Sequence, residues 1–222
     1  MFTIRPLPPQ IDAARLALLA KAEPATIGHF RHIGFMDPAI KALQQDVRVA
    51  GTAVTVVAPG PDSTIVHFAL GQIRPGDFLV IDRQGDMKHA VTGGAVIYAA
   101  RKAGAAGVII DGYATDFQEI REFGLPVWCR GTTPITGKGL GLAGAFCVPV
   151  SCGGVAVNPG DAIVADENGV LVLPPAEIEA AANKAIAMQK AEKEVTFKRI
   201  DAGEKIGDIS GATARVLANL AP

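Results

Sequence analysis

Cysteine is scarce in this chain, and its three cysteines form no recognisable motif. Cys129, Cys147 and Cys152 are odd in number and lack CxxC spacing, so the sequence indicates neither a disulfide framework nor a zinc site. Aromatic residues make up only 5% of the chain, and the formal net charge is −1, with no block of Lys and Arg. Because phosphate neutralisation needs a clustered basic face, this charge pattern argues against nucleic acid as a partner.

Long hydrophobic runs are missing as well. No uncharged apolar stretch approaches the roughly 18 residues that a membrane-spanning helix needs, and residues 1–10 lack the apolar core of a signal peptide. We therefore expect a cytoplasmic protein with no membrane association. The chain has 222 residues, of which 49% are hydrophobic, so it can bury a full core. We expect one domain over residues 1–174, followed by a C-terminal helix and tail over residues 175–222.

What the sequence does contain is an alternation of short apolar runs and helical segments. We predict strands over residues 53–57, 78–81, 108–110 and 127–129, and helices over about 63–71, 93–103 and 116–123. This alternation is typical of βαβ crossovers, hence of an α/β fold. After Pro134 the pattern changes to short Gly-rich segments, with strands expected over 146–150, 154–157, 162–165 and 170–173. The sheet is therefore predicted to be mixed.

Two stretches of the chain repeat one pattern. Residues 73–82 and 157–166 share an apolar residue, Pro-Gly-Asp, an apolar run containing Val, and a final Asp. Proline presets such a turn and glycine supplies a positive φ, so each copy is interpreted as a tight turn leading into a strand. The C-terminal segment from 175 to about 200 carries an Ala-rich apolar stripe. That helix either packs on its own domain or reaches a neighbouring subunit.

Candidate chemistry gathers between residues 93 and 116. Thr92 is the expected N-cap of the helix that follows, and Gly93 and Gly94 would leave free backbone amides at its start, where the helix dipole favours an anion. Asp116 follows the strand over 108–110 and could bind a divalent cation of the Mg²⁺ type through one carboxylate oxygen. The Asp116-x-x-Glu119 spacing also fits a capping box, so capping and metal binding both stay open.

Several motifs in a fixed order resemble those of the RraA-like family. They run from Gly93 through Asp111-Gly112 and Asp116 to Pro126-Val127, and further matches occur at residues 51–56, 75–77, 130–134, 148–155 and 159–170. The family contains 4-hydroxy-4-methyl-2-oxoglutarate aldolases and the regulator of ribonuclease activity A. The resemblance implies an αββα sandwich like the swivelling phosphohistidine domain. It also implies a homotrimer or a hexamer, with sites near subunit boundaries.

The resemblance also implies roles for individual residues. Those matching Gly93, Gly94, Ala95 and Val96 hold the substrate carboxylate, and Asp116 takes part in holding Mg²⁺ or Mn²⁺. The metal chelates a 2-oxo acid and stabilises the enolate formed when a carbon–carbon bond is cleaved. The same site can decarboxylate oxaloacetate.

This chain departs from the aldolases of the family at two positions. Thr115 stands where they carry Arg, and Gly94 stands where they carry Asp or Glu. Arg130 and Lys88 are candidates to restore the positive charge. Asp82, Asp86 and His89 are candidate acids or bases; His67, on the predicted helix over 63–71, is expected only to pack there.

Three functions are therefore open. The first is a metal-dependent lyase, an aldolase or decarboxylase, acting on a small 2-oxo acid with altered specificity. The second is a non-catalytic regulator that binds another protein, which the loss of both family residues favours. The third is an enzyme acting on a sugar acid on the same scaffold.

Overall fold

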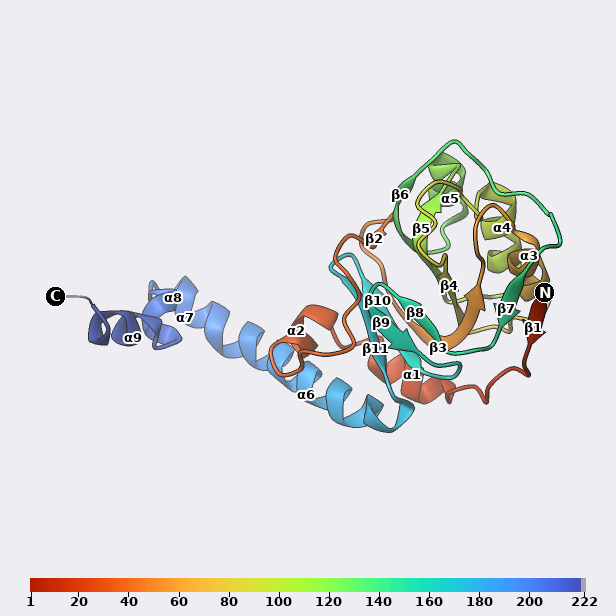
Figure 1. Cartoon of the computed structure of the whole chain (residues 1–222). Helices are drawn as coiled ribbons and strands as arrows, with labels where there is room; N and C mark the ends of the chain where they lie inside the picture. Colours follow the sequence, from red (N-terminus) through yellow and green to blue (C-terminus); the bar gives the residue numbers. More distant parts are fainter. Residues whose placement is uncertain (221–222) are drawn as a thin grey trace.

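The computed structural model describes residues 1–220 as a rounded body from which a helical arm extends (Figure 1). Within this part of the chain, nine strands form one mixed sheet and two more form a small hairpin. Four parallel strands make up the centre of the sheet, in the order β3 (Arg48–Val57), β4 (Asp77–Asp82), β5 (Gly107–Ala114) and β6 (Val127–Thr132). The predicted strands at these places and the parallel crossovers between them are confirmed.

Three short helices make the crossovers and cover one face of these strands. They are α3 (Thr64–Leu70), α4 (Gly94–Lys102) and α5 (Phe117–Phe123), close to the predicted ranges. Their inward side chains pack on alternate residues of the strands, such as Leu79 and Ile81 of β4 and Ile110 of β5. All four parallel strands therefore end at the same edge of the sheet, and the loops that follow them meet there.

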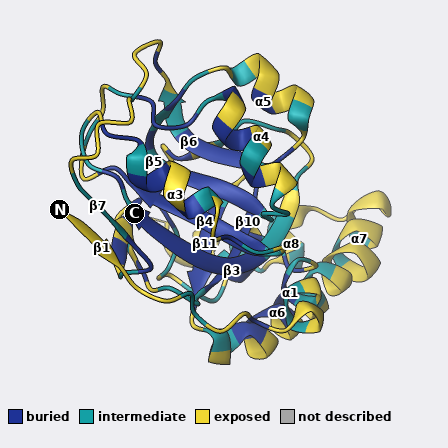
Figure 2. Cartoon of the chain, turned by 90° about the vertical axis from the view of Figure 1, so that its right-hand side faces the viewer, coloured by how far each residue is buried: buried dark blue, intermediate teal, exposed yellow. Residues whose placement is uncertain are grey.

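The strand β3 is long enough to belong to two halves of the sheet. Its residues 52–57 pair with β4, whereas residues 48–52 pair in antiparallel fashion with β10 (Ala162–Asp166), which in turn pairs with β11 (Gly169–Leu173). The helices α1 (Ala13–Leu19), α2 (Pro24–Gly28) and α6 (Ile178–Ala191) pack on the outer face of β10 and β11. In Figure 2 the central strands lie buried in the interior and the helices present their exposed sides outward.

A second core fills the space between the two halves. Phe78 and Trp128 point away from α4 and meet Ile163 and Val172 from the other half. The indole of Trp128 also donates a hydrogen bond of 2.8 Å to the carbonyl of Asp166. The layers therefore follow the order helix, sheet, sheet, helix, and the expected αββα sandwich is confirmed, with both sheets being parts of one continuous sheet. The likeness to the phosphohistidine domain stays a prediction.

Short strands complete the molecule, and here one prediction is wrong. They are β1 (Phe2–Ile4), β2 (Lys41–Ala42), β7 (Gly144–Phe146), β8 (Val150–Cys152) and β9 (Val155–Val157). The strand expected over 146–150 is broken, because β7 ends at Phe146 and β8 begins at Val150. Cys147 between them has a φ of 54°, which no strand residue adopts, and Pro149 lacks an amide for the ladder.

The repeated Pro-Gly-Asp stretches form the same turn twice. Gly76 and Gly160 have φ angles of 87° and 94°. In both copies the Asp carboxylate accepts a hydrogen bond of 2.8 Å from the backbone amide three residues before it, of Arg74 for Asp77 and of Asn158 for Asp161. One turn leads into β4 and the other into β10, so the predicted turn chemistry is confirmed.

The first part of the C-terminal segment packs on the body, and the rest extends away from it. Ile178, Ala181, Ala182 and Ala185 of the predicted stripe are buried against α1 and α2, but Met188 and Ala191 become progressively exposed. A π-helical turn (Glu192–Thr196), α7 (Phe197–Asp201), α8 (Ile206–Ile209) and α9 (Ala212–Ala218) continue outward as the arm, residues 192–220 (Figure 1). Packing on its own domain, one of the two alternatives, thus holds for the first half of the stripe.

Candidate functional site

A cleft of about 180 Å³ opens where the parallel strands end. Each strand contributes the loop or helix start that follows it, from α3 after β3 to the segment at Thr136 after β6. Six polar side chains line the cleft together with the glycine pair at the start of α4: Ser63, His67, Thr92, Thr115, Asp116 and Thr136. The expected substrate-binding residues Gly93, Gly94, Ala95 and Val96 all line it as well. Thus the structure brings these four residues, Thr115 and Asp116 together.

Asp116 turns its carboxylate toward the start of α4. Its Oδ2 accepts a hydrogen bond of 2.9 Å from the amide of Gly94, and its Oδ1 accepts one of 3.2 Å from the hydroxyl of Thr115. Although Asp116 occupies the N-cap position of α5, its side chain does not cap that helix. A φ of 59° at Asp116 directs the side chain away from α5. The capping box that competed with metal binding is therefore not formed.

The glycine pair allows carboxylate oxygens to approach the helix start closely. A Cβ atom added to Gly93 would lie 2.5 Å from Oδ2 of Asp116, and one added to Gly94 would lie 1.9 Å from Oε2 of Glu119. Gly93 is the N-cap of α4 and provides no side-chain cap. The amides of Ala95 and Val96 have no intrahelical acceptor, since the first N–H groups of a helix lack one. They are thus available to an anion in the cleft.

Thr92 was expected to cap α4, and this prediction is wrong. The N-cap is Gly93, and Thr92 is only 1% exposed in the wall of the cleft. Among the described residues its Oγ1 has no hydrogen-bond partner. A buried hydroxyl without a partner costs about 1–3 kcal/mol. The cleft therefore contains a polar atom that a bound ligand or its water can satisfy.

A strap formed by residues 133–143 runs across the carboxyl edge and closes one side of the cleft. The amide of Ala90 donates to the carbonyl of Ile135 at 2.8 Å, and the amide of Ser63 donates to that of Lys138 at 2.9 Å. The buried carboxylate of Asp62 anchors the strap by accepting hydrogen bonds from the amides of Leu140 and Leu142 at 3.0 and 2.6 Å.

The pKa of Asp62 reflects this anchoring. Burial alone would raise it, but the hydrogen bonds from Thr64 and from the strap outweigh burial and lower the pKa well below the usual carboxyl range. Asp62 is therefore charged at neutral pH, and its charge holds the strap in place.

Arg130 does not reach the cleft. It lies on the same side of β6 as Trp128, facing the second core, and its guanidinium pairs with Asp111 at 2.5 Å and with Asp37 at 2.7 Å. The two carboxylates raise its pKa although burial opposes them. A charge held this way is not available to a substrate beside Asp116. The expectation that Arg130 supplies the missing cation is therefore not supported by its position.

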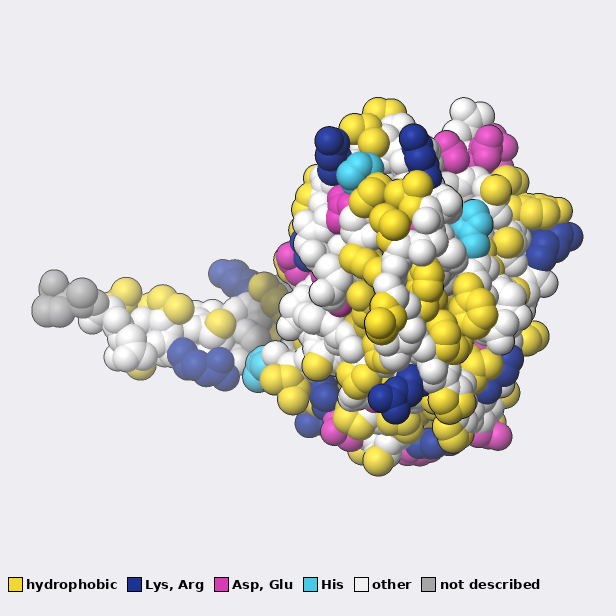
Figure 3. Space-filling view, turned by 45° about the vertical axis from the view of Figure 1, so that its right-hand side comes forward, with side chains coloured by type: hydrophobic (Ala, Val, Ile, Leu, Met, Phe, Trp, Pro, Cys, Tyr) yellow, Lys and Arg dark blue, Asp and Glu magenta, His cyan; other side chains and the backbone are white. Residues whose placement is uncertain are grey.

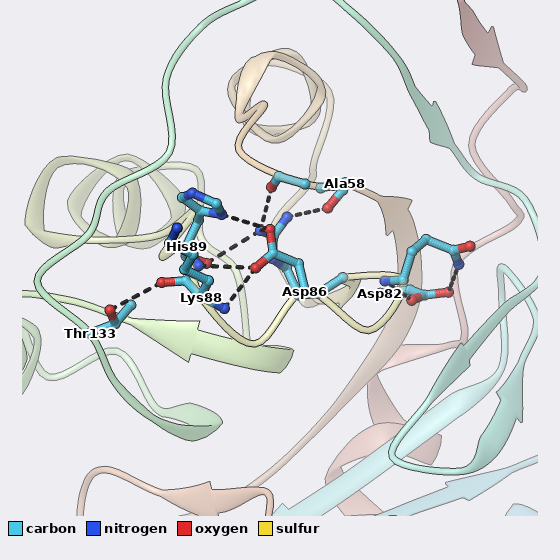
Figure 4. A network of polar contacts seen from close by, with 9 residues as sticks. Ala58, Asp82, Asp86, Lys88, His89 and Thr133 are labelled. Carbon is cyan, nitrogen blue, oxygen red and sulfur yellow. Dashed lines mark hydrogen bonds and ion pairs between the residues drawn. The ribbon is translucent and has the colours of Figure 1, made fainter.

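The loop after β4 is organised around a buried arginine that the sequence reading overlooked. Arg83 is fully buried and donates to the carbonyls of Ala58, Gly60 and His89, and it pairs with Asp86 at 3.3 Å. Figure 4 shows the polar contacts that hold this loop. An Arg directly after a buried strand, with acidic residues on both sides, was the available signal.

The candidate acids and bases of this loop are all engaged: Asp82 accepts hydrogen bonds from Gln84, and Asp86 contacts His89. Nδ1 of His89 lies 2.9 Å from Oδ2 of Asp86. Burial alone would raise the pKa of Asp86. The hydrogen bonds from His89 and Lys88 and the charge of Arg83 outweigh burial and lower this pKa to about 2. Lys88 is exposed, and its backbone rather than its side chain makes the recorded contacts, with Asp86 and Thr133. None of these residues is part of the cleft lining.

His67 is the polar residue that the sequence reading placed wrongly. It was expected only to pack on its helix, but it is exposed and lines the cleft. An imidazole can hold or accept a proton near neutral pH. The signal that could have found it is topological: α3 follows β3, and β3 is the immediate neighbour of β4 in the sheet.

The cleft lining contains carboxylate and hydroxyl groups but no Lys or Arg. Within residues 1–220 no group of three or more His, Cys, Asp or Glu is arranged around a common metal position. A hard cation of the Mg²⁺ type binds through oxygen atoms, often one or two carboxylates together with several waters. A larger hollow of about 460 Å³ lies beside α2, but its Arg31 already pairs with Glu177 and it contains no carboxylate. The smaller cleft therefore carries the better candidate chemistry.

The fold and the cleft together define a four-layer α/β protein with a polar site at the carboxyl edge of parallel strands. A model of the RraA-like family, described as aldolase/RraA, matches residues 19–172. The chain belongs to the RraA-like family, as its motifs indicated.

Known proteins of this kind resemble the chain over most of its length. A protein of Halalkalibacterium halodurans, named provisionally as a 4-hydroxy-4-methyl-2-oxoglutarate aldolase, is 40% identical over 146 residues, which are 66% of this chain and 69% of that protein. The crystal structure of Streptomyces coelicolor RraAS2, described as an unusual member of the RNase ES inhibitor RraA family, matches with a TM-score of 0.74 at 28% identity, over 84% of this chain and 98% of that one.

A third protein resembles the chain in fold. It comes from Pseudomonas syringae pv. tomato and matches with a TM-score of 0.78 over 94% of this chain and 98% of its own. At 22% identity this likeness concerns the fold alone. Across the described residues, the helices are too short or too polar to cross a membrane.

Proposed function

We propose that this protein is a Mg²⁺- or Mn²⁺-dependent lyase that cleaves a carbon–carbon bond in a small 2-oxo acid. The observation that carries the proposal is the carboxylate of Asp116, held at the start of α4 by the amide of Gly94, in a cleft whose wall also contains the unpartnered hydroxyl of Thr92. The aldolase name of the Halalkalibacterium relative supports the reaction class.

In this proposal the residues of the cleft have different roles. The amides of Ala95 and Val96 bind the substrate carboxylate, and Asp116 holds the cation. A bound cation supplies Lewis-acid stabilisation of the negative charge that develops on the keto oxygen as the bond breaks. His67, on the α3 side of the cleft, is placed to hold or accept the proton that the reaction moves.

Electrostatics explains why this cleft needs a cation. Two unit charges of the same sign about 4 Å apart repel by about 4 kcal/mol at an effective dielectric constant near 20. A substrate carboxylate brought toward Asp116 meets this repulsion, and no Lys or Arg of the cleft lining offsets it. A divalent cation held by Asp116 would attract the substrate carboxylate and so reverse the sign of the interaction.

Release of pyruvate from a panel of 2-oxo acids, with and without Mn²⁺, tests the proposal. We expect metal-dependent release in the wild type and its loss in Asp116→Asn. Asp201→Asn, an exposed Asp on the arm, is the control that should retain activity. Silence of the wild type across the panel would refute the lyase and favour the protein-binding regulator, which the likeness to RraAS2 supports. Turnover of sugar acids alone would identify the third function.

We further propose that the specificity differs from that of the 4-hydroxy-4-methyl-2-oxoglutarate aldolases. Thr115 offers one hydroxyl, which already donates to Asp116, whereas Arg offers a charged bidentate fork. We therefore expect a low kcat/KM for dicarboxylic aldols, and we expect Thr115→Arg to raise it. Restoring an acid at position 94 as well should raise it further, although that side chain must displace Glu119. Robust wild-type turnover that these changes fail to improve would contradict the account.

We propose, finally, that the protein assembles as a homotrimer or hexamer through the arm. Its outward side chains include several large apolar residues at 195, 197, 200, 216 and 217. Figure 3 shows hydrophobic side chains along the arm, away from the body. A second copy of the chain is the partner that would cover them.

A further inference from the structure

Glu119 places a carboxylate at the start of α4 from a different helix. It lies on the first turn of α5, three residues after Asp116. Its Oε2 occupies the position that a side chain on Gly94 would fill, since a Cβ built there would lie 1.9 Å away. Asp116 Oδ2 has the same relation to Gly93, at 2.5 Å. Two carboxylates thus fill the two positions left open by the glycine pair.

Glu119 has no structural partner that explains this position. Within residues 1–220 it forms no ion pair, and its carboxylate accepts no hydrogen bond. The reciprocal bond of a capping box is absent too, because α5 has no side-chain cap. Its neighbour Glu122, on the same helix and exposed as Glu119 is, accepts a hydrogen bond of 3.0 Å from Gln118.

The hydroxyl of Thr92 is an independent indication of a ligand here. It is buried in the wall of the cleft that Asp116 and the glycine pair line, and it has no partner among the described residues. The carboxylates of Asp116 and Glu119 at the start of α4 and the hydroxyl of Thr92 all offer oxygen atoms. Oxygen ligands that include two carboxylates suit a hard divalent cation and its water shell.

We propose that Glu119 is a positioning residue of the cation site, acting together with Asp116 on a divalent cation or on a water of its shell. This inference rests on the proposed function, because it presumes that Asp116 binds the cation. It adds that α5 supplies the second acid, in place of any side chain at position 94. Residues that orient a metal's direct ligands or its waters typically contribute 10–100-fold to affinity.

The test is Mn²⁺ binding by the full-length protein, measured from the electron paramagnetic resonance signal of free Mn²⁺. This measurement needs no turnover. We expect Glu119→Gln to weaken binding about 10–100-fold and Asp116→Asn to abolish it. Glu122→Gln, the matched control on the same helix, should bind as the wild type does. Near-ultraviolet circular dichroism confirms that each variant is folded.

A relocation of the carboxylate sharpens the test. Glu119→Ala should bind weakly, and adding Gly94→Glu to it should restore affinity, because the new carboxylate enters the space that Glu119 has left. A folded double variant that binds no better than Glu119→Ala would overturn the inference.

The outcomes separate the two proposals. If Glu119→Gln binds Mn²⁺ like the wild type while Asp116→Asn does not, the inference is wrong and the metal-dependent lyase stands. If the wild type itself binds no Mn²⁺, the proposed function fails and this inference fails with it.

Discussion

Replacing Arg83 by methionine tests whether one buried cation organises the carboxyl edge of the sheet. The substitution keeps most of the apolar stem but removes the guanidinium. Arg83 donates to the carbonyls of Ala58 and Gly60 after β3 and to that of His89 in its own loop, and it pairs with Asp86 (Figure 4). The substitution thus leaves three carbonyls and a largely buried carboxylate without their partner.

The magnitude follows from what is left unpaired. Removing one member of a buried ion pair typically costs about 3–5 kcal/mol, because the other charge stays buried. In a protein of this size each kcal/mol lowers Tm by about 2–4 °C, so we expect a drop of about 6–20 °C. The Tm of Arg83→Lys should lie between those of the wild type and Arg83→Met, since one ammonium group cannot reproduce the planar fork of the guanidinium.

Differential scanning calorimetry measures this change, with Arg101→Met as the control. Arg101 is an exposed arginine on α4, and its loss should change Tm by no more than about 2 °C. An Arg83→Met protein that melts within 2 °C of the wild type would refute the reasoning, since it would show that the loop carbonyls find equal partners in water.

Three further predictions concern stability, reactivity and assembly. Asp62→Asn should lower the free energy of unfolding by about 1.5–3 kcal/mol, measured by urea titration. Because the folded-state pKa of Asp62 is lowered, the difference in unfolding free energy between wild type and variant should be largest at neutral pH and should decrease as the pH falls below about 4. A difference that stays the same at low pH would contradict the charge argument. Burial raises the pKa of Cys129 and Cys147 to about 11, so a thiol reagent at pH 8 should modify them only after unfolding, and rapid modification of the folded protein would show otherwise. Light scattering at micromolar concentration should give a mass above the 23.0 kDa of one chain, and Phe197→Asp on the arm should reduce it; a monomer mass for the wild type would exclude assembly.

Much of the fold could be predicted because its signals are local. The β-branched run at 108–110 and the Pro-Gly-Asp turns specify strands and turns through neighbouring residues alone. The prediction of a strand over 146–150 was wrong because Cys147 adopts a positive φ, which cannot be predicted from a cysteine in the sequence. The N-terminal helices α1 and α2 were not predicted; they are short and owe their stability to packing on α6 and β11.

The site was predictable only in part, because sequence order does not show which face a side chain takes. Asp116 and the glycine pair could be placed together, since both follow neighbouring parallel strands. Arg130 was expected at the cleft, but successive strand residues point to opposite faces of the sheet. Cys129 faces α4, so Arg130 lies on the other face together with Trp128. Glu119 could not be found at all, because its position depends on how closely α5 approaches α4 across the glycines.

The length of β3 has a consequence for how the molecule comes apart. One half of this strand pairs with β4 and the other half with β10, so both halves of the sheet lose a neighbouring strand if β3 leaves. Heat or denaturant should therefore melt the site half and the C-terminal half as one cooperative unit rather than as two domains. Backbone amides at Ala50 and Val56, although paired with different halves, should then exchange with solvent at the same free energy of opening.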